Sequence, residues 1–317
     1  MSEIRSVIIS KTKRVIIPNT RKVIALGFFD GVHIGHAKLL ERIKLRASET
    51  GFIPAVLSFD RHPDALIKGE SVPLINSASD RAELIERLFG VSSVFFLRFD
   101  QALRSLGWRE FLDMAVNKYN ASHLVAGADF RFGYQGGGDA ENLYSYCSEN
   151  GLGCDIIPQV YSEGIAVSST FIRDLLTSGE IERANRFLGH PHILTGTVRH
   201  GKRLGREIGA PTVNMSFPKG VLIPARGVYC AKAHFGDETR NAVTNIGIKP
   251  TVGNNEHITV ESHLLDYDGD LYGKRLRLEF FKFLRPEHHF DNLAALSTQI
   301  ELDVLETRKF FAAEAQF

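Results

Sequence analysis

The 317-residue sequence lacks the features that mark secreted, membrane-spanning and nucleic-acid-binding proteins. Its three cysteines form no Cys-x-x-Cys pair, which argues against a disulfide framework and favours a reducing compartment. No apolar run reaches the roughly 18 residues that span a bilayer, and charged residues interrupt the N-terminus where a signal peptide would be apolar. The net charge of +1 is far from the basic excess of a dedicated nucleic-acid binder. We therefore expect a cytoplasmic protein that binds neither membranes nor nucleic acids.

The Gly-x-x-x-x-Gly-Lys-Ser/Thr pattern of P-loop proteins is also missing, so any nucleotide is expected to be held in another way. What is present is ordinary for a globular protein, with 44% apolar and 24% charged residues. The length of 317 residues favours two domains.

The first part of the chain alternates between strand and helix patterns. Strands are expected over 22–28, 54–59, 93–98, 122–126 and 154–157, and helices over 36–50, 79–89, 108–119 and 139–149. This alternation predicts a doubly wound, Rossmann-like α/β domain with a parallel sheet. Ligands of such sheets bind at the carboxyl ends of the strands.

From about residue 192 the pattern becomes all-β. Two short helices, expected over 169–177 and 180–188, come before it. The strand patterns that follow lie over 194–200, 227–235, 240–247, 257–264 and 275–284. Turn residues separate them, including Gly236-Asp237 and Asp268-Gly269, and we interpret the second pair as a hairpin turn. We expect a small antiparallel barrel and a final helix over 290–312, whose apolar face carries Leu293, Leu296, Ile300 and Val304. The predicted domains are residues 1–188 and 189–317.

The stretch 27–36, Gly-Phe-Phe-Asp-Gly-Val-His-Ile-Gly-His, lies where a buried strand passes into an amphipathic helix. Free backbone N–H groups and the helix dipole favour anions there. His33 and His36, three residues apart, can converge on one ligand, and imidazole donors can stabilise charge on phosphoryl oxygens. Each histidine alone could be a surface or core residue. A pair of metal ligands is the other reading, although no nearby cysteine or third histidine completes a zinc set.

A second phosphate signal is the helix start at Ser168-Ser169-Thr170. Hydroxyl residues cap helices well, and such N-termini bind phosphate. Arg173, one turn later, can add a fixed positive charge. The alternative is a capped helix whose arginine faces solvent.

Residues 201–214, Gly-Lys-Arg-Leu-Gly-Arg-Glu-Ile-Gly-Ala-Pro-Thr-Val-Asn, combine repeated glycines with basic residues, which suits a loop that wraps phosphates. Thr212 and Asn214 alternate and therefore face the same side of a short strand. Their hydroxyl and amide oxygens are suitable ligands for Mg²⁺ shared with phosphates. A glycine-rich connection with exposed basic residues is the plainer reading of the spacing alone.

Residues 27–36 resemble the His-x-Gly-His signature of the nucleotidyltransferase superfamily, and specifically the adenylyltransferase half of bacterial bifunctional riboflavin kinase/FAD synthetases. The segments 58–63, 127–133 and 168–173 follow in the order of that family. The resemblance implies ATP contacts, with His33, His36 and Arg173 catalytic, at Gly27, Phe28, Asp30, Gly31, His33, Gly35, His36, Ser169, Thr170 and Arg173. It also implies a flavin site at Phe59, His62, Pro63, Asp129, Phe130 and Phe132.

Residues 201–214 resemble the riboflavin kinase signature, and so do 245–251, 260–263, 270–274 and 284–287. The resemblance implies that Glu261 is the base for the flavin 5′-hydroxyl, with a further flavin contact at Arg285. We expect Glu261 to point into the barrel. The implied ATP contacts, with Mg²⁺ at Thr212 and Asn214, are Gly201, Lys202, Gly205, Arg206, Gly209, Pro211, Thr212 and Asn214.

The resemblance runs from about residue 15 to 310 and implies a bifunctional enzyme. The C-terminal barrel would convert riboflavin and MgATP to FMN and ADP, and the N-terminal domain would convert FMN and MgATP to FAD and pyrophosphate. The implied partners are small-molecule substrates only, with a monomer or weak homo-oligomer as the expected state.

Two departures from the family pattern leave alternatives open. Arg61 stands where the family usually has proline, and Gly136 lies in a glycine-rich stretch that usually holds a basic residue. Loss of that charge could weaken binding of the FMN phosphate, unless another residue such as Arg61 supplies it. One rival is therefore a monofunctional riboflavin kinase with an impaired adenylyltransferase domain. The other is a flavin-binding regulatory module without turnover.

Overall fold

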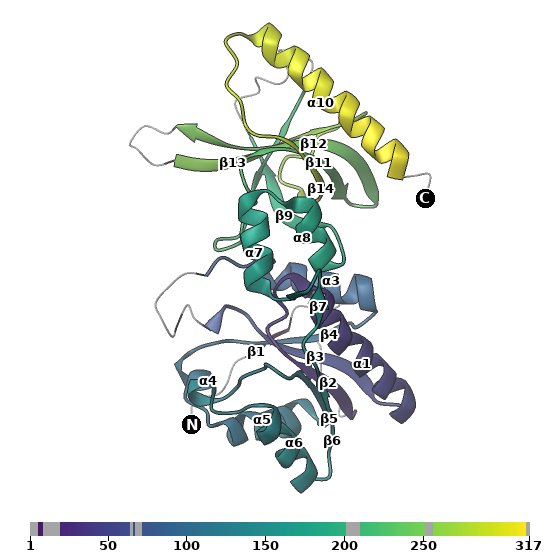
Figure 1. The fold of residues 1–317 in the computed structure, drawn as a ribbon, viewed down its shortest axis with the longest axis vertical. Coiled ribbons are helices and arrows are strands. Elements are labelled where there is room, and N and C mark those ends of the chain that lie inside the picture. Colours follow the sequence, from purple (N-terminus) through teal and green to yellow (C-terminus); the bar gives the residue numbers. More distant parts are fainter. Residues whose placement is uncertain are drawn as a thin grey trace. The chain divides into compact units, whose positions relative to one another are not determined.

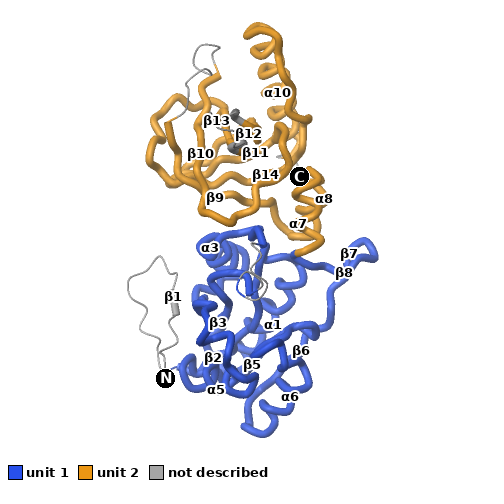
Figure 2. The backbone as a smooth tube through the Cα atoms, turned by 90° about the vertical axis from the view of Figure 1, so that its left-hand side faces the viewer, with its two compact units in different colours: residues 1–169 blue, residues 170–317 orange. Residues whose placement is uncertain are grey.

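The structure is a computed structural model that describes residues 20–63, 66, 72–200, 210–250 and 256–314, together with strand β1 (Ser6–Ile8). The chain divides between Ser169 and Thr170 into two units, which Figure 2 shows in blue and orange. No helix among the described residues is long and apolar enough to cross a membrane.

The first unit is built on a six-stranded sheet in the order β1-β4-β3-β2-β5-β6. Strands β2 to β6 are parallel, and only β1, at the edge, runs antiparallel to its neighbour β4. The chain order reverses between β2 and β5, so their carboxyl ends form the topological switch point where α/β folds bind ligands. The bounds are β2 Lys22–Leu26, β3 Ile53–Phe59, β4 Ser93–Leu97, β5 Ala121–Gly127 and β6 Gly153–Ile157.

Helices cover both faces of this sheet, as Figure 1 shows for α1 on one side and α5 and α6 on the other. One face packs Ile24 and Leu26 against Phe111 of α5 and Leu143 of α6. This confirms the predicted doubly wound fold. The helical elements are η1 Asp30–Val32, α1 Ile34–Thr50, α3 Ala78–Phe89, α4 Gln101–Arg104, α5 Trp108–Tyr119, η2 Tyr134–Gly136 and α6 Ala140–Glu149.

Helix α1 shows why the sequence folds as predicted here. His33 is its N-cap, and Gly51 ends it in the left-handed conformation that glycine adopts at low cost. The apolar residues predicted to share a face are the ones the structure buries, namely Leu39, Leu40, Ile43 and Ala47. A small hairpin, β7 (Tyr161–Ser162) and β8 (Ile165–Ala166), then leads to α7 (Ser169–Ser178).

The second unit contains a closed antiparallel barrel in the order β10-β13-β12-β11-β14-β9, which Figure 1 shows together with α10. This confirms the predicted small barrel with a terminal helix. Gly236 and Asp237 form the tight turn between β11 and β12, as expected. The elements are α8 Ile181–Leu188, β9 His192–Arg199, β10 Val213–Ser216, β11 Gly227–Phe235, β12 Glu238–Pro250, β13 Glu256–Leu264, β14 Arg275–Arg285 and α10 Leu293–Glu314.

Two expectations about this unit were wrong. Asp268-Gly269 is not a hairpin turn, because β13 and β14 are not neighbours in the barrel and residues 265–274 cross between them. Leu293 does not lie on a buried face of α10, since its side chain is 50% exposed. The buried face is displaced along the helix to Asp303, Thr307 and Phe311. Val304 packs against the cluster of Val228, Val243 and Leu265.

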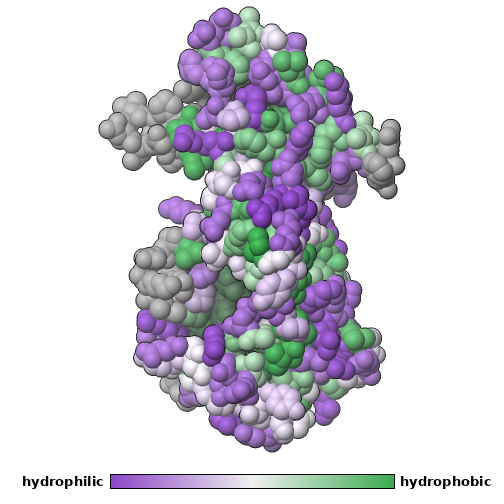
Figure 3. All heavy atoms as spheres, viewed as in Figure 1, coloured by the Kyte–Doolittle hydropathy of each residue, from purple (hydrophilic) through white to green (hydrophobic). Residues whose placement is uncertain are grey.

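The predicted domain boundary lies at 188/189, whereas the compact units divide at 169/170. Helices α7 and α8 lie between these two positions and belong to the second unit. Asn185 of α8 donates to the carbonyl of Phe280 in β14 and accepts from the backbone N–H of His192. These bonds explain why α8 groups with the barrel. The boundary between the two predicted activities stays a prediction. Hydrophilic and hydrophobic residues are mixed over the face of the protein seen in Figure 3.

Candidate active sites

A cavity of about 270 Å³ lies at the carboxyl ends of β2 and β5, the switch point of the sheet. It brings together residues from five segments that are far apart in the sequence. Of the predicted ATP and flavin contacts, it is lined by Gly27, Phe28, His33, Gly35, His36, Asp129, Phe130 and Ser169. Sequence reasoning did not identify the opposite wall, which is formed by Ile157, Pro158, Gln159 and Val160.

The two histidines form a stacked pair at the start of α1. Their ring centroids are 3.6 Å apart, with 14° between the ring planes. Nδ1 of His33 accepts a hydrogen bond of 3.3 Å from the backbone N–H of His36. Because Nδ1 accepts this bond, Nε2 is the ring atom of His33 that can donate to a ligand. Gly35 allows this arrangement, because a Cβ there would lie 3.1 Å from the His33 ring.

His36 is neutral at physiological pH. Burial lowers its pKa well below the usual value, and the nearby charges of His33 and Arg81 lower it further. A neutral imidazole can donate to a phosphoryl oxygen without the cost of desolvating a cation. The pair therefore offers two ring donors at a helix N-terminus, and His36 is the neutral one.

A buried framework holds the chain in place behind the histidines. The carboxylate of Asp30 is fully buried and accepts from the backbone N–H groups of Ile75 and Asn76, each at 3.2 Å. Asp30 and Gly31 thus shape the turn without lining the cavity. Val32 follows with φ of 45°, a strained value for a β-branched residue, and such strain is typical of functional sites.

Arg81 of α3 completes this framework from within the core. Its guanidinium donates to the carbonyls of Phe28 (2.6 Å) and Phe59 (2.9 Å) and to Oγ of Ser58 (3.1 Å). The side chain is fully buried, and burial lowers its pKa to about 10, so it remains charged at neutral pH. It therefore fixes the ends of β2 and β3, on which the site is built.

A second, more apolar cavity of about 570 Å³ lies in the same unit. Phe59, Pro63 and Phe132, predicted to contact the flavin, line it. His62 is not among its lining residues and packs edge-on against Phe28. The remaining wall comprises Phe99, Leu103, Arg104, Phe111, Arg131, Gly133, Gln135 and Gly136. Sequence reasoning missed the first four of these residues, whereas the others lie in the segment 127–133 and in the glycine-rich stretch that follows it.

The remaining residues predicted at this site are Thr170 and Arg173. Both are on α7 and belong to the second unit, where Nη1 of Arg173 lies 3.4 Å from Oγ1 of Thr170. Arg61, which we considered as a source of charge for the flavin phosphate, is not among the lining residues of either cavity and lies beside Asp60.

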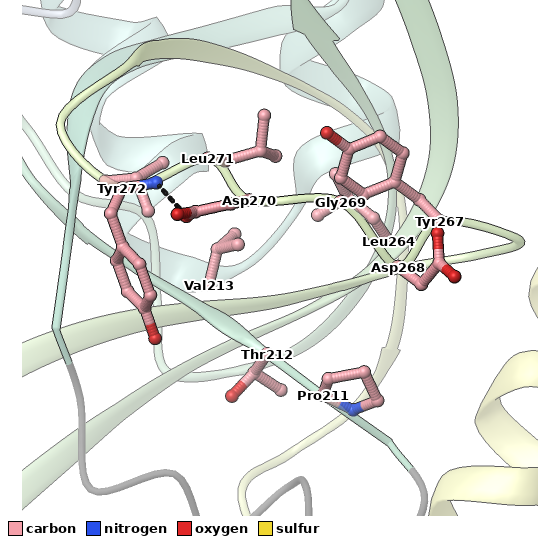
Figure 4. Close-up of a pocket in the computed structure, with 11 residues that line it drawn as sticks. Pro211, Thr212, Val213, Leu264, Tyr267, Asp268, Gly269, Asp270, Leu271 and Tyr272 are labelled. Atoms are coloured by element: carbon pink, nitrogen blue, oxygen red, sulfur yellow. Dashed lines mark hydrogen bonds between the residues drawn. The ribbon is translucent and has the colours of Figure 1, made fainter.

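In the second unit, a cavity of about 390 Å³ lies between the start of β10 and the crossover 265–274. Figure 4 shows Pro211 and Thr212 on one side of it, facing Tyr272 and Asp270 on the other. Asp270 accepts a 2.9 Å hydrogen bond from the backbone N–H of Tyr272, which fixes the crossover. The cavity thus joins the predicted nucleotide contacts Pro211 and Thr212 to the segment 270–274, which also resembles the riboflavin kinase signature.

Glu261 lies on the outer face of the barrel, so the expectation that it points inward was wrong. The inward positions of β13 are its neighbours Val260 and Ser262, which are almost fully buried. Glu261 stands directly opposite Asn214 of β10 and Asn245 of β12, and in antiparallel pairs such residues share a face. The face therefore gathers a carboxylate between two amides.

Arg285 and Glu287, at and after the end of β14, belong to the segment 284–287 that resembles the riboflavin kinase signature. Glu287 reaches over β12, where its carboxylate occupies the space that a side chain at Gly247 would need. Arg285, a predicted flavin contact, is held by Asp303 of α10, with Nη2–Oδ2 at 2.7 Å and Nε–Oδ1 at 3.0 Å. The predicted phosphate loop, with Gly201, Lys202, Gly205, Arg206 and Gly209, lies outside the described residues.

Comparisons with known proteins agree with this architecture. Residues 16–171 match the FAD synthetase family and residues 188–311 match the riboflavin kinase family. The chain belongs to the family of bifunctional riboflavin kinase/FMN adenylyltransferases.

Three similar proteins illustrate the relationship. The bifunctional riboflavin kinase/FMN adenylyltransferase of Listeria monocytogenes is 35% identical over 92% of this chain and 93% of its own length. The protein of that name from Pseudomonas fluorescens is 37% identical, over 92% and 94%. A solved structure, described as a macrolide-efflux protein from Streptococcus pneumoniae, matches with a TM-score of 0.81 and 29% identity over 91% and 94% of the two chains.

Proposed function

We propose that the chain makes FAD from riboflavin in two steps at two sites. The second unit phosphorylates riboflavin with ATP to give FMN and ADP, and the first unit adenylylates FMN with ATP to give FAD and pyrophosphate. The observation that carries the proposal is the switch-point cavity, because it unites His33 and His36 with Ser169 and Asp129. Both families match this chain, which supports two activities.

At the first site, ATP lies in the cavity with its phosphates at the start of α1. The rings of His33 and His36 donate to the phosphoryl oxygens as charge builds up on them. An oxygen of the FMN phosphate attacks the α-phosphorus, and the bond from that phosphorus to the bridging oxygen breaks, so pyrophosphate leaves with the electron pair. Ser169 lines this cavity. Thr170 and Arg173, further along α7, stay predicted ATP contacts, because a hydroxyl and a guanidinium suit phosphate oxygens.

The flavin ring lies in the neighbouring apolar cavity. Its aromatic wall, from Phe59 to Phe132, gives a planar ring system large contact areas. Asp129 and Phe130 contribute from the nucleotide side. In-line attack needs little covalent help from the protein, so catalysis rests on positioning and charge stabilisation.

At the second site, Glu261 accepts the proton of the riboflavin 5′-hydroxyl as that oxygen attacks the γ-phosphorus of ATP, and ADP leaves. Asn214 and Asn245, which flank it, orient the carboxylate and the substrate. Mg²⁺ fits here, because Thr212 and Asn214 place neutral oxygen donors on the side that carries Glu261. When bound, the ion would neutralise charge on the phosphates. The cytoplasmic location, the lack of a nucleic-acid partner and the monomeric or weakly associated state stay predictions.

The test is a chromatographic product assay on the full chain with ATP and Mg²⁺, one tube starting from riboflavin and one from FMN. We expect FAD in both tubes. His36→Ala should abolish FAD in the second tube but still convert riboflavin to FMN. Glu261→Ala should abolish the conversion of riboflavin to FMN but still make FAD from supplied FMN. Glu238→Ala, which removes an exposed strand glutamate paired with Arg240, is the matched control and should keep both activities.

The outcomes separate the alternatives. FMN without FAD in either tube would indicate the monofunctional kinase, and no product in either tube would indicate the module without turnover. Loss of both activities in one folded variant would contradict the assignment of two separate sites.

A further inference from the structure

Arg131 occupies a position that no other described residue shares. Its side chain lines both the switch-point cavity and the apolar cavity of the first unit. It follows β5, between Phe130, which lines the first cavity, and Phe132, which lines the second. Those two rings are stacked 5.6 Å apart. The backbone therefore passes along the boundary, and Arg131 is the residue that the linings of the two cavities have in common.

The chemistry of adenylyl transfer gives that boundary a meaning, if the proposed function holds. ATP in the first cavity and the flavin ring in the second can react only if the FMN phosphate reaches the α-phosphate of ATP. The two groups are both anionic and must come within bonding distance. A cation at the meeting point would reduce their repulsion, which in a partly desolvated site is large.

Nearby groups hold the guanidinium in place without using up its donors. Nη1 of Arg131 donates to Oδ2 of Asp139 at 3.1 Å, while Oδ1 of Asp139 accepts from the backbone N–H of Asn142 at 3.0 Å. Asp139 is thus a fixed helix cap that anchors the arginine. An arginine has five N–H donors, and this bond uses one of them. The arginine side chain is 63% exposed, so a phosphate can approach it.

The neighbouring glycine connects this geometry with a departure noted in the sequence. Gly136 also lines the apolar cavity, and it lies in the glycine-rich stretch for which the family resemblance implies a basic residue. A Cβ at Gly136 would lie 3.5 Å from Cβ of Arg131. A basic side chain at 136 would therefore start beside Arg131, and its charge would serve the same place.

We propose that Arg131 binds the phosphate of FMN at the boundary of the two cavities and positions it for attack on the α-phosphate of ATP, supplying the charge that Gly136 lacks. The guanidinium donates to the phosphate oxygens that do not attack. As the new bond from the FMN oxygen to the α-phosphorus forms, the bond to the leaving pyrophosphate breaks. No proton has to move, since the attacking phosphate is already ionised.

The experiment measures KM for FMN and for ATP during FAD formation by Arg131→Gln, which keeps a polar side chain but removes the charge. Loss of a charge-assisted contact to this exposed group should raise KM for FMN about tenfold and KM for ATP much less. KM for FMN in the unaltered protein should rise with ionic strength, and this dependence should weaken in the variant. Riboflavin phosphorylation should not change.

A rescue and a control complete the design. Gln135 lines the same cavity and already has a left-handed φ of 54°, so Gln135→Arg adds a charge there without new backbone strain. In the Arg131→Gln background it should recover part of the lost affinity for FMN. Arg109→Gln removes an exposed arginine that is paired with Glu149 and should leave both KM values within about twofold.

An Arg131→Gln variant whose KM for FMN stays within twofold of the unaltered protein would overturn the proposal. An equal rise of both KM values, without rescue, would do so as well, because it would indicate a general distortion. Failure of the proposed function gives a different result. In that case the His36→Ala variant would still make FAD from FMN, whereas the outcomes above concern only Arg131.

Discussion

Oγ of Ser169 donates a 2.9 Å hydrogen bond to the backbone carbonyl of Asp30, and this bond joins two motifs that lie 139 residues apart in the sequence. Asp30 belongs to the turn before the histidine pair, and Ser169 begins α7. The carboxylate of Asp30 is anchored at the same time to the backbone of Ile75 and Asn76. One residue thus ties three segments together around the switch-point cavity.

Ser169→Ala should weaken this closure. Loss of the hydrogen bond should cost about 1 kcal/mol of the stability of the first unit, because the carbonyl is left without that partner. It should also raise KM for ATP in FAD formation, since Ser169 lines the cavity. Urea unfolding followed by the fluorescence of Trp108, the only tryptophan, reports on this unit. Ser178→Ala, which removes a hydroxyl bonded within α7, is the control and should leave KM for ATP unchanged.

Arg81→Met should destabilise the first unit by about 3 kcal/mol, since it leaves buried acceptors at Phe28 and Phe59 without their charged donor. FAD formation should fall further than stability alone requires, because the ends of β2 and β3 carry the site. Arg87→Met, at an exposed position of the same helix, should have a much smaller effect. Trp108 fluorescence in urea tests this, and equal effects of the two variants would contradict the framework role of Arg81.

Asp155 should make the stability of the first unit depend on pH. Its carboxylate, whose side chain is 9% exposed, accepts from Arg46 and Arg42 of α1 at 2.7 Å and from His123 of β5 at 2.8 Å. The bond from Arg46, followed by those from His123 and Arg42, holds the pKa of Asp155 well below its usual range. Because the folded-state pKa is depressed, the stabilisation is present above the unfolded value near pH 4 and is lost as the pH falls toward the folded value.

The corresponding measurement compares Asp155→Asn with the unaltered chain by urea unfolding. The substitution should cost about 2 kcal/mol at pH 7. The difference should shrink by roughly 1 kcal/mol between pH 5 and pH 3, as protonation in the unfolded state removes the advantage of the carboxylate. Asp266→Asn breaks a bidentate but exposed pair with Arg308 and should have a far smaller effect. A difference that does not change with pH would refute the assignment.

Arg285 presents a choice between two roles, a contact with the flavin or an anchor for α10. Its bidentate bond with Asp303, a residue that is 5% exposed and also accepts from Gln299, favours the anchor. Asp303→Asn and Arg285→Gln should then each lower the stability of the second unit by about 3 kcal/mol. The double variant should cost little more than either single one. Thermal unfolding of the four proteins measures this coupling.

The kinetic readout distinguishes the two roles. If Arg285 acts mainly through α10, both single variants should raise KM for riboflavin to a similar extent. A rise confined to Arg285→Gln would instead support the flavin contact that the sequence predicts.

Local patterns predicted much of this fold. The helical spacing of Leu39, Leu40, Ile43 and Ala47 identified the buried face of α1 correctly, since that helix has one covered side. On α10 the same reasoning was wrong for Leu293, because the helix covers the barrel with its later turns. Asp303 and Thr307 are buried there through hydrogen bonds to Arg285 and Cys230, partners that no spacing rule supplies.

Glu261 shows that alternation along a strand cannot predict which side chains point into the barrel. Alternation along β13 separates two faces, but it does not say which one is inside when both are partly covered. Val243, two positions before Asn245 on β12, packs near Val304 of α10 on the outer side, so the outer face also contains apolar residues. Only closure of the barrel assigns Ser262 to the interior and Glu261 to the outside.

The sequence by itself determined the strand and helix order and the chemical groups of each motif, because these depend on short-range periodicity and residue type. Tertiary structure alone decided which groups meet. It placed Arg131 between two cavities and buried the carboxylate of Asp30 behind the histidines. The physical reason is that a motif specifies donors and charges, whereas their partners come from segments that only the packing of sheet and helices brings within hydrogen-bond distance.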